Sequence, residues 1–197
     1  MRIHPFLPIA ALSLAAVSKG QTVEQKLQWA RETIDANAVT HHQEPPAQSG
    51  GTRWQVMKID GCTMELKETV HREASDAVIT SAGVFGSSDD KIVTWDFDLG
   101  VLIPEFVSAD TSVAVPQIKI FAEGDAFHLK TEFVSRTIRK DGTVADTRTW
   151  SSPGNARNLW MNFDSPTVDN KAVVRRLESD LRNAVMECSG KQFRSHR

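Results

Sequence analysis

Hydrophobic residues near the start of the chain recur with the spacing of a helix. Four of them follow one another at intervals of four, three and four, which places them on one stripe of a helix over residues 23–36: Val23, Leu27, Ala30 and Ile34. Thr22 and Gln25 have the spacing of a capping box, in which two side chains satisfy the first free amide groups of a helix. The sequence therefore predicts a short amphipathic helix here.

From Thr52 to about Phe163 the spacing of hydrophobic residues changes to two, the period of a strand with one buried face. The clearest strand covers residues 93–99, where Val93, Trp95, Phe97 and Leu99 alternate with polar residues. Weaker strands are expected at residues 54–59, 62–70, 77–85, 117–122, 127–138, 143–150 and 158–163. No segment between them has helical spacing, so the sheet is expected to be antiparallel.

A second amphipathic helix is predicted near the end of the chain, where five residues fall at intervals of three, four, four and three: Val174, Leu177, Leu181, Val185 and Cys188. Asp169 suits its N-cap and Gly190 its left-handed C-cap. The elements together predict an α+β fold. We expect an antiparallel sheet or partly open barrel of about seven to eight short strands, packed by the C-terminal amphipathic helix and preceded by the short N-terminal helix.

Residues 1–20 have the composition of a secretory signal peptide. A basic head precedes an apolar stretch from Phe6 to Val17, and cleavage is expected after the small residue Gly20 or, as a second choice, after Ser18. A buried N-terminal helix is the alternative. The remaining chain divides into an N-terminal helix and Pro/Gly linker over residues 21–51, a β-rich domain with its C-terminal helix over 52–190, and a tail over 191–197. We therefore expect a secreted or periplasmic protein.

Charge and composition narrow the classes of partner. The chain has 197 residues, of which 40% are hydrophobic and 24% charged, values that suit one globular domain. Removal of the signal segment takes away Arg2 and Lys19 and no acid, which leaves 21 basic residues against 25 acidic ones and a formal charge of −4. Such a chain lacks the positive field that binds nucleic acid. No apolar run reaches the roughly 18 residues of a membrane span, so we expect neither a nucleic-acid partner nor a membrane span.

The two cysteines, Cys62 and Cys188, lie far apart in the sequence, and both fall on faces expected to point inward. An even number of cysteines in an oxidising compartment predicts a disulfide bond. Two buried free thiols, which behave as small hydrophobic groups, are the alternative. Their separation excludes a CxxC redox or zinc motif.

One pair of carboxylates is a candidate for catalysis. The sequence contains no phosphate-binding loop, GxGxxG, HExxH, EF-hand or GxSxG motif, so no cofactor and no metal is predicted. Asp96 and Asp98 lie on the same side of the clearest strand, roughly 6–7 Å apart by strand rise, where two carboxylates can act as acid and base or hold a hard cation. The alternative is that they occupy the solvent face of an antiparallel strand.

Asp141-Gly142 predicts a hairpin turn, and four basic residues around it form the best candidate for binding: Arg136, Arg139, Lys140 and Arg148. Such a surface suits an anionic ligand or partner. A solvated polar hairpin is the alternative.

Histidines and tryptophans give weaker signals. His41, His42 and Glu44 are potential metal ligands, but their Pro-rich segment favours a solvated linker. His71 and His128 are expected to be isolated surface residues. Among the tryptophans, Trp95 is expected in the core. The others suggest a carbohydrate platform only weakly, although Trp150 and Trp160 have the opposite parity to their hydrophobic neighbours, so one of them can be exposed.

Four short segments carry a resemblance to known sequences: TVEQKLQW, DGCTMEL, WDFDLGVL and AVMEC. With these segments the chain resembles a group of uncharacterised secreted bacterial proteins. Its order of strands closed by one helix is similar to that of pleckstrin-homology-like barrels. The resemblance implies a shared small β-rich domain and brings no catalytic residue with it.

These observations favour an exported, non-catalytic domain that binds an unknown protein or small-molecule ligand in the periplasm or outside the cell. Two alternatives remain. One is a secreted hydrolase that uses Asp96 and Asp98, and the other is a structural protein of the cell envelope.

Overall fold

The computed structural model describes residues 22–44, 48–80 and 83–190, and within them it leaves out the side chains of residues 42–44, 48–49, 74–80 and 83–85. The predicted signal segment, residues 1–20, and the predicted tail, residues 191–197, lie outside the described residues. No helix in the described part has both the length and the apolar character that crossing a membrane requires.

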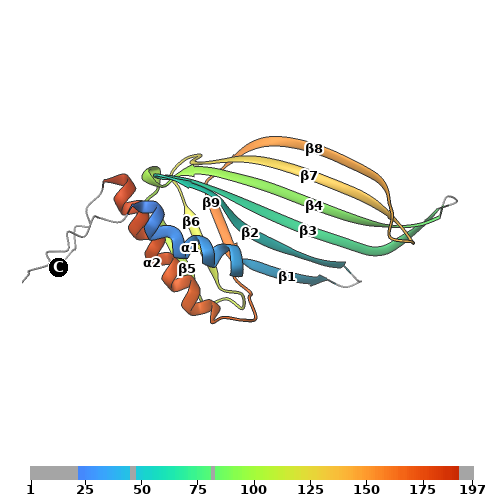
Figure 1. Ribbon diagram of the computed structural model, residues 1–197, viewed down its shortest axis with the longest axis horizontal. Helices are drawn as coiled ribbons and strands as arrows, with labels where there is room; N and C mark the ends of the chain where they lie inside the picture. The colour runs from blue at the N-terminus through green and yellow to red at the C-terminus, as the bar shows by residue number, and fades with distance from the viewer. Residues whose placement is uncertain (1–21, 45–47, 81–82, 191–197) are drawn as a thin grey trace, which may run out of the picture.

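The described chain forms nine strands in two antiparallel sheets, with one α-helix at each end (Figure 1). The strand order is β1–β2–β3–β4–β7–β8 in the larger sheet and β5–β6–β9 in the smaller one. In chain order the elements are α1 (Val23–Asn37), β1 (Val39–Glu44), β2 (Gln48–Asp60), β3 (Thr63–Thr80), β4 (Gly83–Asp98), β5 (Val107–Asp110), β6 (Gln117–Phe121), β7 (Phe127–Arg139), β8 (Val144–Ala156), β9 (Asn158–Asn162) and α2 (Asn170–Ser189). Short 3-10 helices lie at Leu99–Val101 and Pro104–Phe106.

This architecture confirms the predicted α+β fold, and the larger sheet stays open rather than closing into a barrel. The strands differ from the predicted short ones, because β3 has 18 residues and β4 has 16. The segment 77–85, predicted as one strand, belongs to the ends of β3 and β4.

Both predicted helices form, with the predicted caps. Thr22 and Gln25 make the reciprocal hydrogen bonds of a capping box at the start of α1. Asp169 accepts hydrogen bonds from two amide groups at the start of α2, and Gly190 ends that helix with a φ of 63°. The apolar stripes are buried as expected: Val23, Leu27, Ala30 and Ile34 in α1, and Val174, Leu177, Leu181 and Val185 in α2. Burial of the four α2 side chains stabilises the fold by about 8 kcal/mol.

The two faces of the larger sheet differ in burial. We call the face that carries Trp54, Leu66, Phe97 and Phe127 the inner face, because all four side chains are buried in the core under the helices and the smaller sheet. The opposite side is the outer face. Directly paired residues of antiparallel neighbours share a face, so the register assigns every strand position to one of the two.

The helices cover only one end of this sheet. Figure 1 shows α1 and α2 side by side at one end, while β3, β4, β7 and β8 run on well past them. No element that the structure describes lies over the far half of the inner face. That half is therefore a sheet face continuous with the core but open to solvent.

The segment predicted as a Pro/Gly linker contributes to the sheet instead. Residues 39–44 form β1, which pairs with the first half of β2, while residues 45–47 lie outside the described chain. Gly50 and Gly51 serve close packing there. A Cβ atom added to Gly50 would lie 2.4 Å from the His71 carbonyl oxygen, and one added to Gly51 would lie 2.5 Å from the Thr40 carbonyl oxygen. The two glycines therefore mark a place where neighbouring backbones approach closely. In the sequence alone, such a Gly-Gly pair has the same composition as a linker.

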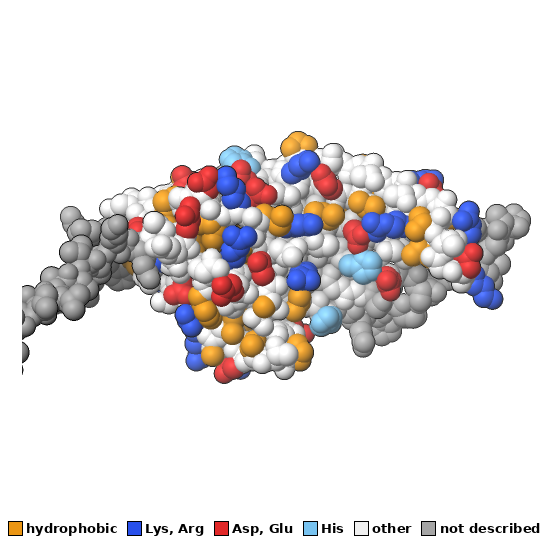
Figure 2. Space-filling model, viewed as in Figure 1, with side chains coloured by type: hydrophobic (Ala, Val, Ile, Leu, Met, Phe, Trp, Pro, Cys, Tyr) orange, Lys and Arg blue, Asp and Glu red, His pale blue; other side chains and the backbone are white. Residues whose placement is uncertain are grey.

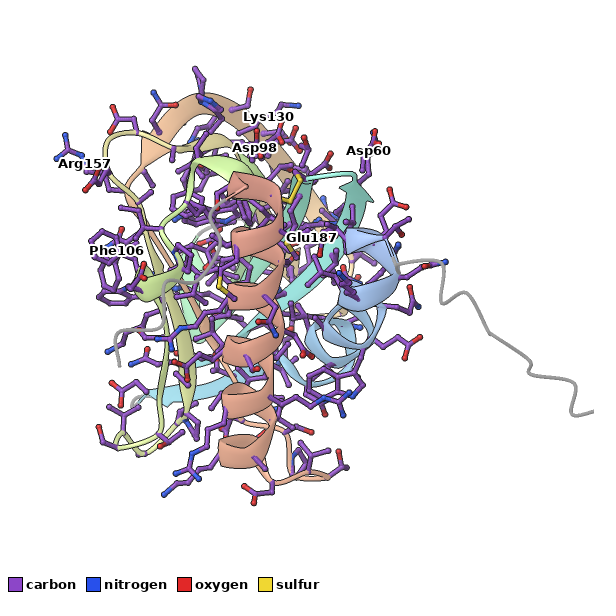
Figure 3. The ribbon with its side chains drawn as sticks, turned by 90° about the vertical axis from the view of Figure 1, so that its left-hand side faces the viewer. Asp60, Asp98, Phe106, Lys130, Arg157 and Glu187 are labelled. Atoms are coloured by element: carbon purple, nitrogen blue, oxygen red, sulfur yellow. A yellow bond between two sulfur atoms is a disulfide. The ribbon has the colours of Figure 1, made fainter. Side chains whose placement is uncertain are left out.

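The predicted disulfide between Cys62 and Cys188 is confirmed, with Cα atoms 5.6 Å apart. It joins the turn between β2 and β3 to the last turn of α2, 126 positions later in the chain (Figure 3). Lys26 of α1 also pairs with Glu187 of α2. Both links fix the C-terminal helix against the covered end of the molecule.

Candidate functional site

The two candidate catalytic carboxylates are exposed on the outer face of β4. Asp98 accepts a hydrogen bond from the Gly100 amide at 2.7 Å and caps the first 3-10 helix (Figure 3). A shallow depression of about 450 Å³ lies beside Asp96 and Asp98 and is bordered by further exposed acids, Glu123 and Asp125. Acid–base catalysis needs a carboxyl whose surroundings tune it, and all four of these remain in contact with water. In the described part of the chain, no group of His, Cys, Asp or Glu has an arrangement that would hold a metal ion.

The four basic residues of the predicted hairpin surface do not converge. Arg136 lies on the outer face, where its guanidinium contacts Asp90. Arg148 lies on the inner face, while Arg139 and Lys140 stand at the turn between β7 and β8. Figure 2 shows basic and acidic side chains interspersed over the long sheet in its view, without a large area of one sign. The structure therefore does not bring the four residues together as one positive surface.

The potential metal ligands His41, His42 and Glu44 form no site among the side chains that the structure describes. His41 is exposed in β1, and the side chains of His42 and Glu44 belong to the part that the structure does not describe. His128 is exposed on the outer face and contacts the amide oxygen of Asn155 at 3.1 Å.

His71, in contrast, belongs to a cross-strand charge cluster on the outer face. The Asp90 carboxylate contacts both the His71 Nδ1 atom and the Arg136 guanidinium, and His71 Nε2 lies 3.2 Å from the Glu73 carboxylate. Burial favours a protonated Asp90, but the hydrogen bonds from Arg136 and His71 outweigh it and lower the Asp90 pKa. The hydrogen bond to Asp90 raises the pKa of His71. Since these charges are paired, the cluster joins β3, β4 and β7 and leaves no free group for a ligand.

A groove of about 270 Å³ opens on the uncovered half of the inner face. Its lining residues are Val70, Arg72, Asp89, Asp90, Lys91, Phe133, Val134, Ser135 and Trp150. The register places seven of these nine on the inner face, and only Asp90 and Val134 alternate to the outer one. The volume lies close to the lower end of the roughly 300–1,000 Å³ of small-molecule sites.

The walls of the groove are apolar. One row of residues crosses β3, β4, β7 and β8, and each member lies directly opposite the next: Val70, Lys91, Phe133 and Trp150. All of them except Lys91 are apolar. The Phe133 and Trp150 rings are stacked, with centroids 5.1 Å apart and planes at 11°. Trp150 is 52% exposed, although its strand is otherwise composed of small and polar side chains. A large aromatic group held in place by a stacking partner and left open to water is typical of a ligand contact.

Three charged residues of the inner face line the same groove. Arg72 lies directly opposite Asp89, and Lys91 lies between Val70 and Phe133. None of the three charged groups forms an ion pair or a side-chain hydrogen bond with another described residue. They differ in this from the paired charges of the outer face, and their hydrogen-bonding capacity is open to a ligand.

One further carboxyl group stands at the end of the groove nearest the core. Glu68 is only partly exposed on the inner face, and its carboxylate accepts a hydrogen bond from the Trp95 indole at 3.3 Å. Burial raises the Glu68 pKa and outweighs the opposing effects of Lys91 and of that hydrogen bond. Glu68 is thus turned toward the core and engaged with Trp95.

No protein-family model, no curated protein and no solved structure matches this chain.

Only part of this site could be predicted from the sequence. The parity of Trp150 and Trp160 indicated that one of them is exposed, and both are, at 52% and 51%. Phe133 and Glu68 were missed, because their roles depend on which residues face them across the sheet. The one available signal was a tryptophan within a run of Thr, Ser and Arg on β8.

Proposed function

We propose that this protein is an exported, non-catalytic binding protein that holds a small amphiphilic ligand in the groove on its inner face. The observation that carries the proposal is the stacked pair of Phe133 and Trp150, which presents an aromatic wall to solvent on an uncovered half of the core face. Apolar walls with a few polar groups between them are the usual composition of a small-molecule site.

Export is supported by two observations. Residues 1–20 have the pattern of a signal peptide. The disulfide between Cys62 and Cys188 is compatible with an oxidising compartment outside the cytoplasm.

A non-catalytic role is supported by the chemistry of the described acids and bases. Asp96 and Asp98 are exposed, and the histidine that has acidic neighbours, His71, is engaged with Asp90 and Glu73. A general base needs a free position within hydrogen-bond reach of the substrate. The free carboxylate of the groove, Asp89, is exposed and lies opposite Arg72, and no histidine is among the described residues that line the groove.

The test is a titration of the purified protein with N-phenylnaphthylamine, a neutral fluorescent probe that brightens in apolar surroundings. We expect saturable binding at one site, which Trp150→Ala weakens by about tenfold or more, since large aromatic contacts dominate such sites. Trp160→Ala is the matched control, because Trp160 has almost the same exposure but lies in β9 of the smaller sheet. Absence of saturable binding, or equal effects of the two substitutions, would contradict the proposal.

A further inference from the structure

The charges of the groove distinguish it from the rest of the sheet. On the outer face Asp90 is shared between His71 and Arg136, so that these charges neutralise one another locally. In the groove, Arg72 and Lys91 have no ion-pair partner among the described residues. Both cations are exposed, so a negatively charged group can reach them, and the apolar side chains beside them exclude part of the surrounding water.

Lys91 is placed to meet a ligand that lies against the aromatic wall. Its two direct neighbours across the sheet on the inner face are Val70 and Phe133. Phe133 in turn is backed by Trp150 at 5.1 Å. A flat or chain-like body that lies between Val70 and Phe133 therefore passes directly over the Lys91 stem, within reach of its ammonium group.

Arg72 comes one row further from the core and gives the second donor. Successive rows on one face are about 7 Å apart by strand rise, so the Arg72 guanidinium and the Lys91 ammonium can reach one anionic head group from two sides. A guanidinium presents two parallel N–H groups that match the two oxygens of a carboxylate.

Two acids limit what this pair of cations can bind. Asp89 lies directly opposite Arg72, and Glu68 lies at the core end of the groove. The Glu68 carboxylate accepts a hydrogen bond from the Trp95 indole and also interacts with Lys91, whose charge it offsets in part. Asp89 is exposed within the lining and repels a second negative charge. Because Asp90 is engaged by His71 and Arg136, the free charges of the lining are two cations and one acid, which suit a single negative charge.

We propose that the ligand of the groove is an amphiphilic organic monoanion, with a carboxylate held between Lys91 and Arg72 and an aromatic or alkyl body placed against Val70 and the Phe133–Trp150 stack. This inference rests on the proposed binding function and specifies its ligand class. It also assigns a role to Asp89, which disfavours dianions.

The experiment is displacement of bound N-phenylnaphthylamine by compounds with the same aromatic body and different head groups: phenylpropionate, its neutral amide and phenylpropylamine, with benzylmalonate as the dianion. The wild-type protein is expected to bind the carboxylate about tenfold more tightly than the amide, since hydrogen bonds between charged groups contribute that much. The amine and the dianion are expected to bind more weakly than the carboxylate.

Variants locate the head group. The double substitution Arg72→Gln with Lys91→Gln is expected to abolish the preference for carboxylate over amide while the affinity for the neutral probe is retained, which shows that the groove is still folded. Lys67→Gln removes a cation from the outer face of β3 and is expected to leave the preference unchanged. The inference is overturned if the amide, the amine or the dianion binds as tightly as the carboxylate, or if the double variant still prefers the carboxylate to the amide. Failure of the neutral probe to bind at all would instead overturn the proposed function.

Discussion

Trp150 of the edge strand β8 lies flat against Phe133 of β7, with ring centroids 5.1 Å apart and an angle of 11° between the planes. Edge strands usually carry small, charged or turn-forming residues that discourage further pairing, and the rest of β8 follows this rule. The stack therefore places an exposed indole where folding alone does not require one. It is the feature on which the account of binding depends.

The stack predicts a measurable coupling between its two rings. Phe133→Ala and Trp150→Ala should each lower the free energy of unfolding. The loss in the double variant should be about 0.5 kcal/mol smaller than the sum of the two single losses. This coupling is at the low end for aromatic pairs because Trp150 is half exposed. Urea denaturation of the four proteins measures the coupling. Strict additivity would show that the rings do not stabilise one another in solution.

The disulfide predicts a large dependence of stability on oxidation. Cys62 and Cys188 close a loop of 126 positions, so replacement of both by serine should lower the free energy of unfolding by up to about 5 kcal/mol in the chain-entropy account. Guanidinium unfolding with and without a reductant measures this difference. Both cysteines must be replaced together, because a single substitution leaves a free thiol. An unchanged midpoint would mean that the bond is absent from the folded protein.

The raised pKa of Glu68 predicts that its charged carboxylate lowers the stability of the fold at neutral pH. Its pKa is raised by burial, so the protonated form stabilises the fold below the ordinary pKa of 4.5, and that contribution is lost as the pH rises through the folded-state pKa. Glu68→Gln should therefore be more stable than the wild type near pH 7 and equal to it near pH 4. The neutral amide oxygen can still accept the hydrogen bond from the Trp95 indole.

Thermal unfolding over this pH range tests that prediction. Glu65→Gln, on the outer face of the same strand, controls for the loss of one negative charge. A Glu68→Gln variant that is less stable than the wild type at pH 7 would indicate that the carboxylate itself stabilises the fold.

The outer-face cluster predicts a second decline of stability, in a higher pH range. The His71 pKa is raised by its hydrogen bond to Asp90, so its contribution to stability is complete below 6.5, the ordinary value, and disappears as the pH rises through the folded-state pKa. The lowered Asp90 pKa gives stability that is present above 3.8 and is lost as the pH falls through its folded-state value. The cluster should stabilise the protein most between these two limits.

His71→Gln isolates the first of these effects. The variant should lose the decline in stability that the wild type shows above pH 6.5, as followed by urea midpoints at several pH values. His128→Gln, also on the outer face and bonded to neutral Asn155, is the control. A decline that persists in His71→Gln would assign it to another group.

Local patterns along the chain were enough to predict the helices, their caps and the core face of β4. The spacing of Val174, Leu177, Leu181 and Val185 and the cap at Asp169 depend on residues within a few positions of one another. The disulfide also followed, because both cysteines lie at the ends of elements whose apolar faces were visible in the sequence.

The site could not be predicted in the same way, because it depends on register between distant strands. Phe133 meets Trp150 across one hairpin, but Lys91 meets Phe133 across a separation of about forty residues that includes β5 and β6 of the smaller sheet. The groove also exists only because α1 and α2 cover one end of the long strands, and strand length was underestimated from sequence. Regular alternation also separates Arg136 from Arg148, because Arg136 pairs with Thr147 while Arg148 pairs with Ser135 on the other face.

The most direct test of the central claim is to follow backbone amide chemical shifts by nuclear magnetic resonance while N-phenylnaphthylamine is added to the intact protein. The account predicts that the largest changes fall on Val70, Lys91, Phe133 and Trp150, in the uncovered half of β3, β4, β7 and β8. Changes centred on the acidic depression beside Asp96 and Asp98, or spread evenly over the surface, would contradict it.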